Sequence, residues 1–236
     1  MRPLCVFFDI GATLIRGPNV SPVKTIIAAL EDAYNPDVIP AHDLEKDILT
    51  LDTRTVSGLA VVLMGYGVPK AAALRAAQEV WRTQVVGPEV IPGGPELLEN
   101  LCRANIPYGF ISNIWHPYAQ SFERLYGELA TRAKAPTVYS YRHGYVKPSP
   151  RLFVTALREA RYIETPERCI MIGDTYLTDI APALLFGMKT VHVHHRPEKE
   201  ASSISDYTCG RLLAPDRCVD AIGAISIEML HSLTAS

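Results

Sequence analysis

The sequence predicts an α/β protein in which a doubly wound parallel sheet carries an inserted helical segment. Two patterns predict the sheet: short apolar runs alternate with amphipathic helical stretches from about residue 92 onward, and the first run, Leu4–Phe8, is apolar without interruption. Continuous apolar strands are typical of parallel sheets that are covered on both faces, and the alternation implies right-handed crossovers. A third observation predicts the insertion, because only helical patterns lie between the first strand and residue 89.

The insertion and the core divide the chain into two predicted parts. Ser21 and Pro22 are typical of a helix start, and the apolar residues that follow fall on one helical stripe. Further helices are expected over residues 43–54, 56–64 and 69–84. We therefore expect a core domain of residues 1–15 and 89–236 and a helical cap of residues 16–88.

Each later strand of the core is expected to follow a helical stretch. These strands are Tyr108–Ile111, Thr137–Tyr139, Cys169–Ile172 and Thr190–His194. A further helix is expected from Asp179 to Phe186. The tail is less regular, and it suggests a short strand near Tyr207 and a helix from Asp216.

The composition excludes several classes of protein. The chain has 236 residues, 48% of them hydrophobic and 20% charged, and no apolar run approaches the ~18 residues of a membrane-spanning helix. A net charge of −2 indicates neither a nucleic-acid partner nor an anionic membrane, so a small-molecule substrate is expected. The five cysteines are odd in number and lack metal-site spacing, which favours a reducing, cytoplasmic location. The sequence does not indicate an oligomeric state.

Polar side chains follow the ends of three expected strands. Asp9 follows the first, Ser112 and Asn113 follow the second, and Asp174 comes shortly after Ile172. Lys147 lies on a loop that can reach the same edge. Singly, such residues are common in turns and on surfaces. Because parallel sheets bind ligands at the carboxyl ends of their strands, the group together indicates a site for Mg²⁺ and phosphate.

Four short motifs in this region resemble, in order, the four motifs of the haloacid dehalogenase superfamily. They are DIGAT at residues 9–13, ISN at 111–113, G-x-x-K-P at 144–148 and GDTYLTD at 173–179. The helical insertion is similar to the cap of the branch that contains phosphoglycolate phosphatases and dehalogenases. The resemblance spans nearly the whole chain. It implies a Rossmann-like core and a Mg²⁺-dependent hydrolase with a small phosphorylated substrate.

The resemblance also implies a role for each motif residue. Asp9 would be the nucleophile that forms an aspartyl-phosphate, and Lys147 would neutralise charge beside it. The implied phosphate-binding residues are Thr13, Ser112, Asn113 and Lys147. The implied metal ligands are Asp9, the backbone carbonyl of Gly11, Asp174 and Asp179, where Asp179 acts on a metal-bound water or orients Lys147.

Gly11 departs from the family pattern. Phosphatases of the superfamily usually have a second aspartate two residues after the nucleophile, where it protonates the leaving oxygen and later activates water. The loss of such a general acid lowers a rate by ~10²- to 10⁴-fold. Gly11 still supplies a backbone carbonyl, so the departure removes proton transfer and leaves the expected metal ligand in place.

Three functions remain open on this sequence. The first is a phosphohydrolase or phosphotransferase whose leaving group needs little protonation, such as an acyl phosphate, or whose acid comes from elsewhere. The second is a 2-haloacid dehalogenase, for which Arg54 is a loose candidate for a carboxylate clamp. The third is a binding or regulatory protein with little turnover. Candidate replacements for the acid are His116, His143, Asp43 and Glu45.

His192 and His194 form a separate pattern near the end of the last expected strand. Alternation places them on one face of that strand, a spacing compatible with a transition metal. No cysteine or third histidine has a matching spacing along the sequence. A structural role is therefore favoured for both histidines.

Overall fold

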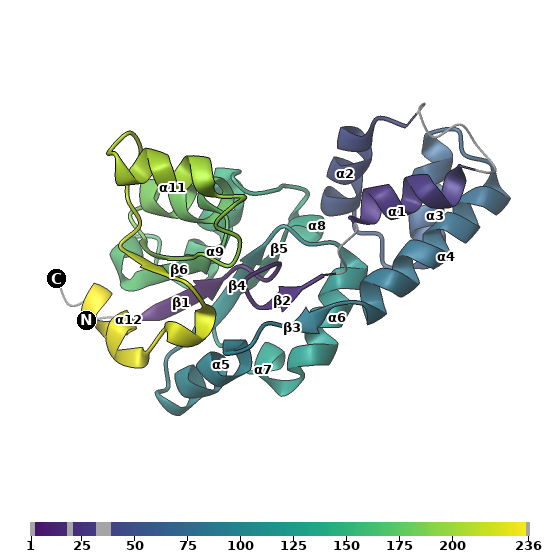
Figure 1. Ribbon diagram of the computed structural model, residues 1–236. Coiled ribbons are helices and arrows are strands. Elements are labelled where there is room, and N and C mark those ends of the chain that lie inside the picture. Colours follow the sequence, from purple (N-terminus) through teal and green to yellow (C-terminus); the bar gives the residue numbers. More distant parts are fainter. Residues whose placement is uncertain (1–2, 18–20, 32–38, 235–236) are drawn as a thin grey trace.

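The computed structural model describes residues 3–17, 21–31 and 39–234. Figure 1 shows a sheet flanked by helices and, to one side of it, a group of helices formed by an early segment of the chain. Most residues of one hydrophobic cluster belong to this group, and Trp115, from the segment that precedes the helix at His116–Tyr126, also belongs to it. Residues 18–20 and 32–38 of the predicted cap lie outside the described residues, and the exact domain boundaries stay a prediction.

Within the described residues, six parallel strands form the main sheet in the order β5-β4-β1-β6-β7-β8. The strands are β1 (Cys5–Phe8), β4 (Tyr108–Ser112), β5 (Thr137–Tyr139), β6 (Cys169–Gly173), β7 (Lys189–Val193) and β8 (Arg217–Val219). In sequence order, β4 and β5 add to one side of β1, and β6, β7 and β8 then add to its other side. This doubly wound order confirms the predicted fold class and places the point where the strand order reverses between β1 and β6, at whose carboxyl ends open α/β sheets bind ligands.

Both faces of the sheet are buried. Along β1, Val6 and Phe8 belong to one hydrophobic cluster, whereas Cys5 and Phe7 belong to another on the opposite face. The first cluster includes residues of α5 (Gly94–Arg103), α6 (His116–Tyr126) and α12 (Ile227–Leu233), and the second includes residues of α9 (Pro150–Glu159) and α10 (Ala181–Leu185). Burial on both faces explains why the first strand is apolar without interruption.

The helical insertion lies between the first two strands of the main sheet. Its helices are α1 (Pro22–Leu30), α2 (Ala41–Thr50), α3 (Val56–Gly65) and α4 (Lys70–Val86). The hydroxyl of Ser21 accepts a hydrogen bond from the backbone N–H of Lys24 at 3.2 Å, which confirms it as the N-cap of α1. A short antiparallel pair, β2 (Ile15–Arg16) and β3 (Glu89–Val90), joins the two chain segments that connect the insertion to the sheet.

The tail departs from the prediction. Tyr207 lies in a helix, α11 (Ala201–Thr208), where its ring packs against that of Tyr176 with centroids 5.4 Å apart. The helix expected from Asp216 is also wrong, because the next residues pair with β7 as strand β8. Contacts with residues far away in the sequence decide both elements, and local strand or helix propensity does not reveal such contacts.

Several short elements complete the described chain. They are α7 (Glu128–Thr131), α8 (Ser140–His143), two 3₁₀ turns at Pro166–Arg168 and Ile222–Ala224, and a π-helical turn at Tyr176–Ile180. The helix expected from Asp179 thus begins earlier, as this π turn, before it continues as α10. Among the described residues, no helix combines the length and the apolar character that crossing a membrane requires.

Candidate active site

Three neighbouring strands end at the candidate site. Asp9 directly follows β1, Asp174 directly follows β6, and Ser112 is the last residue of β4. Because these strands are parallel and adjacent, their carboxyl ends meet at one edge of the sheet. Lys147 reaches this edge from the loop between α8 and α9.

Asp9 is buried and held by two donors. The hydroxyl of Ser112 donates a hydrogen bond to Oδ1 of Asp9 at 3.0 Å, and Nζ of Lys147 donates to the same oxygen at 2.6 Å. Burial raises the pKa of Asp9 above its usual value, although the positive charge of Lys147 opposes this shift. Since both donors bind Oδ1, neither of them occupies Oδ2.

Lys147 directs all three of its ammonium protons into the site. Besides Asp9, it donates to Oδ1 of Asp179 at 2.6 Å and to the backbone carbonyl of Ile111 at 2.9 Å. Burial alone would lower the pKa of Lys147, but the carboxylates of Asp179 and Asp9 outweigh burial and raise it. The ammonium group therefore stays charged at neutral pH.

Asn113 fixes the backbone that carries Lys147. Its Oδ1 accepts a hydrogen bond from the backbone N–H of Lys147 at 2.6 Å, and its Nδ2 donates to the carbonyl of the same residue at 3.1 Å. This double contact makes Asn113 a positioning residue for Lys147. A direct contact between Asn113 and phosphate stays a prediction.

Asp9, Asp174 and Asp179 form a cluster of buried carboxylates. Each offers one ligand oxygen, and these oxygens all lie within 4.8 Å of one another. Burial is the largest cause that raises the pKa of all three groups, and the pKa of Asp174 rises to about 6. Gly173 is needed beside them, because a Cβ at this position would collide with the side chain of Asp179.

Arg196 is a site residue that the motifs did not reveal. Its guanidinium group donates to Oδ2 of Asp174 through Nε at 2.8 Å and also through Nη2. Arg196 lies three residues after β7, whose carboxyl end is at the same edge of the sheet. Asp9 and Asp174 are indicated by their positions just after strands. The same signal could have indicated Arg196, which follows β7.

A cavity of about 430 Å³ lies between this edge of the sheet and the helical insertion. Gly11 from the loop after β1 and Tyr118 of α6 form part of its wall, and Gln84 of α4 lines it from the insertion. Arg196 and Lys199 line it from the loop after β7. The two basic side chains suit an anionic ligand.

Thr13 belongs to the first motif but has no bonded partner for its side chain. The residue is fully buried, and its hydroxyl forms no hydrogen bond among the residues that the structure describes. Burial lowers the pKa of the neighbouring His195, and the backbone of Thr13 partly opposes this shift. Phosphate binding by Thr13 stays a prediction.

The suggested replacements for the missing acid do not line the cavity at Gly11. His116 packs between aromatic rings, with centroids 6.0 Å from that of Trp81 and 5.5 Å from that of Tyr141. Glu45 lines a different cavity, of about 490 Å³, which Asn113 also borders. None of the four suggested acids lines the Gly11 cavity: His116, His143, Asp43 and Glu45. The suggested carboxylate clamp, Arg54, does not line it either, and it pairs with Asp52 at 2.6 Å.

Comparisons with known proteins give one family match and a set of similar structures. Residues 145–213 match the family model of HAD-hydrolase-like proteins, where HAD stands for haloacid dehalogenase. No curated protein matches the sequence. Among solved structures, CbbY from Rhodobacter sphaeroides in complex with phosphate is 16% identical, with a TM-score of 0.64, over 98% of this chain and 100% of its own.

Two further structures show the same likeness. The 2-haloacid dehalogenase from Pseudomonas syringae pv. Tomato DC3000 is 20% identical, with a TM-score of 0.63, over 99% of both chains. The putative HAD-hydrolase YfnB from Bacillus subtilis, bound to magnesium, is 16% identical, with a TM-score of 0.54, over 100% of both chains. The family match and the fold shared over nearly the whole chain confirm the predicted resemblance to the haloacid dehalogenase superfamily, whose fold this protein has.

Proposed function

We propose that the protein is a Mg²⁺-dependent phosphohydrolase that acts on a small phosphorylated molecule through Asp9. The observation that carries the proposal is the setting of Asp9, a buried carboxylate bonded to Ser112 and Lys147 at a strand end. A carboxylate in such a setting can attack phosphorus and divide one difficult displacement into two easier steps. Structures of CbbY with phosphate and with xylulose bisphosphate support a phosphorylated ligand for this fold.

The carboxylate cluster fits a magnesium ion by the chemistry of its donors. Asp9, Asp174 and Asp179 supply the hard oxygen ligands that Mg²⁺ prefers, and Gly11 would add its backbone carbonyl. When bound, Mg²⁺ supplies electrostatic stabilisation of the transferring phosphoryl group. The likeness to YfnB, which was solved with magnesium, supports this assignment.

The proposed reaction consists of two successive displacements at phosphorus, and residues around Asp9 contribute to them. In the first, an oxygen of Asp9 forms a bond to phosphorus, while the bond to the leaving oxygen breaks and its electron pair stays with that oxygen. Ser112 and Lys147 donate hydrogen bonds to the phosphoryl oxygens during this transfer. In the second, water attacks phosphorus, the bond between phosphorus and Asp9 breaks to leave a carboxylate, and the proton of the water passes to solvent or to a phosphoryl oxygen as inorganic phosphate is released.

The site has no strong acid in position to protonate the leaving oxygen, among the described residues that line the cavity. Gly11 has no proton to give, and Tyr118, which lines the same cavity, is a weak acid because burial and the charge of Asp9 raise its pKa. Acyl phosphates release a carboxylate, which leaves without being protonated. We therefore propose substrates with acidic leaving groups of this kind.

The test is a screen of phosphomonoesters and acyl phosphates with and without Mg²⁺. We expect release of phosphate that depends on Mg²⁺ and that is faster for acyl phosphates than for alkyl esters. Halide release from a 2-haloacid without metal would instead favour a dehalogenase. Gly11 favours one other function, a ligand-binding protein, and tight binding of phosphorylated molecules without turnover in any assay would favour it.

The affinity for Mg²⁺ is expected to depend on pH. The pKa of Asp174 is raised to about 6, so below this pH a proton competes with the metal ion for its carboxylate. We expect the affinity to fall by up to about tenfold for each pH unit below this value. Calorimetric titration of the wild-type protein with Mg²⁺ across this range measures the change.

Asp174→Asn provides the matched control for this pH dependence. The variant should bind Mg²⁺ more weakly and should lose the part of the pH dependence that is centred near the pKa of Asp174. An affinity of the wild-type protein that does not change as the pH falls through 6 would contradict the assignment of Asp174 as a ligand.

A further inference from the structure

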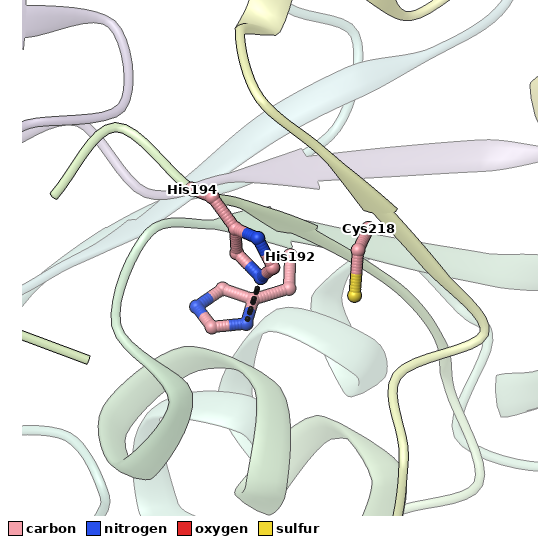
Figure 2. Close-up of side chains that lie close together, drawn as sticks. All are labelled: His192, His194 and Cys218. Atoms are coloured by element: carbon pink, nitrogen blue, oxygen red, sulfur yellow. Dashed lines mark hydrogen bonds between the residues drawn. The ribbon is translucent and has the colours of Figure 1, made fainter. Parts of the chain in front are cut away.

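A second group of side chains of the kinds that bind metals lies next to the carboxylate cluster, because Nε2 of His192 is 3.1 Å from the backbone carbonyl of Asp174. His192 is in β7 and His194 follows this strand, so the two imidazoles project to the same side of the sheet. The neighbouring strand β8 adds a third ligand type, because Cys218 is the direct register partner of His192. Figure 2 shows these three side chains together. Strand pairing thus supplies the cysteine that spacing along the sequence did not indicate.

These groups lie close enough to one another to share one metal ion. The ligand atoms of His192, His194 and Cys218 all lie within 4.8 Å of one another, and Nε2 of His194 is 3.3 Å from Nδ1 of His192. The hydroxyl of Tyr207 lies among these groups, 2.8 Å from Nε2 of His194, 3.5 Å from Nδ1 of His192 and 3.7 Å from Sγ of Cys218. Ligands of a tetrahedral zinc ion lie about 3.3–3.7 Å from one another, given bond lengths of about 2.0–2.3 Å.

The tautomer of His192 is fixed in the form that a ligand needs. Its Nε2 is 3.1 Å from the backbone carbonyl of Asp174, and since a carbonyl only accepts, Nε2 carries the proton and donates. Nδ1 therefore presents its lone pair to His194, Tyr207 and Cys218. Histidines that bind metals usually donate their second ring N–H to a carbonyl or carboxylate in this way, which orients the ring.

We propose that His192, His194 and Cys218 form a binding site for a transition metal ion of the zinc type, separate from the carboxylate cluster. Imidazole and thiolate ligands select such ions over Mg²⁺, which prefers oxygen. Cys218 is exposed, so an ion can reach the site from solvent, whereas His192 is fully buried and provides a fixed anchor. On binding, the thiol of Cys218 loses its proton and His194 presents the lone pair of Nε2. This inference is independent of the proposed phosphohydrolase activity.

The test is a titration of the 236-residue chain with Co²⁺, a spectroscopic substitute for zinc, in excess Mg²⁺, which is there to occupy the proposed magnesium site. We expect one equivalent of Co²⁺ to give a thiolate-to-cobalt charge-transfer band and the visible bands of a tetrahedral site, and Zn²⁺ to remove both. Cys218→Ser should abolish the charge-transfer band and weaken Zn²⁺ binding by about 100-fold or more, because even the loss of an outer partner costs ~10- to 100-fold.

Two further variants keep the result decisive. Cys209→Ser is the matched control, since Cys209 is also an exposed thiol but lies at the end of α11 and is not in the cluster. It should leave the band unchanged. His194→Gln should weaken Zn²⁺ binding while Cys218 remains, with folding of each variant verified by circular dichroism. Absence of the band in the wild-type protein, or a band that persists in Cys218→Ser, would overturn the proposal.

Discussion

Replacing Asp9 with asparagine is expected to lower Mg²⁺-dependent phosphate release by at least about 10⁴-fold, the scale on which loss of a nucleophile acts. Asparagine has nearly the shape of aspartate and can still accept the hydrogen bond from Ser112, but its amide does not attack phosphorus. Initial rates on the best substrate of the screen measure the effect. Asp206→Asn serves as the control, because Asp206 pairs with Arg211 at the surface.

The same variant tests the covalent intermediate directly. Wild-type protein quenched during turnover should carry a phosphoryl group that hydroxylamine releases, on the peptide that contains Asp9. Asp9→Asn should carry none. Phosphate release that survives in Asp9→Asn at a rate close to wild type would show that another group attacks phosphorus, and the proposed role of Asp9 would be wrong.

Replacing Gly11 with aspartate is expected to raise the hydrolysis of alkyl phosphate esters by ~10²- to 10⁴-fold, which is the usual contribution of a general acid. The structure has room for the change, because a Cβ at Gly11 would meet only Tyr118, at an ordinary contact distance of 3.8 Å, among the described residues. Acyl phosphates should gain far less. The ratio of kcat/KM for an ester to that for an acyl phosphate measures the effect.

Gly11→Asn separates proton transfer from side-chain size in this experiment. Asparagine fills the same space as aspartate but cannot act as the acid, so ester hydrolysis should stay near the wild-type rate. An equal gain in Gly11→Asn and Gly11→Asp would attribute the gain to packing against Tyr118. No gain in Gly11→Asp would mean that proton transfer to the leaving oxygen does not limit the wild-type protein.

The sheet and the motif residues could be predicted because their signals are local. An uninterrupted apolar run, as in Cys5–Phe8, is what burial on both faces requires, and a polar residue directly after it lies at the carboxyl end of the strand. The carboxyl ends of adjacent parallel strands lie at the same edge of the sheet, and this does not depend on the conformation of the loops. The sequence alone therefore predicts that Asp9, Ser112 and Asp174 lie at the same edge of the sheet.

Other parts of the molecule depend on contacts that no local pattern encodes. Cys218 lies beside His192 because β7 pairs with β8. The local sequence pattern from Asp216 onward instead predicts a helix, so it does not indicate this pairing. Arg196 belongs to no motif, and its place at Asp174 follows from the path of a loop. The cap was predicted as helices, yet which of its side chains face the cavity depends on how those helices pack against the core.

The ion pairs of the site have a consequence for the order in which ligands bind. With all groups ionised, the carboxylates of Asp9, Asp174 and Asp179 carry three negative charges, and Lys147 and Arg196 carry two positive ones. These five groups therefore have a formal charge of −1, and Lys199, which lines the adjoining cavity, is not among them. A divalent cation at the proposed Mg²⁺ site would change this charge to +1, so we expect an anionic ligand to bind more tightly after the metal than before it.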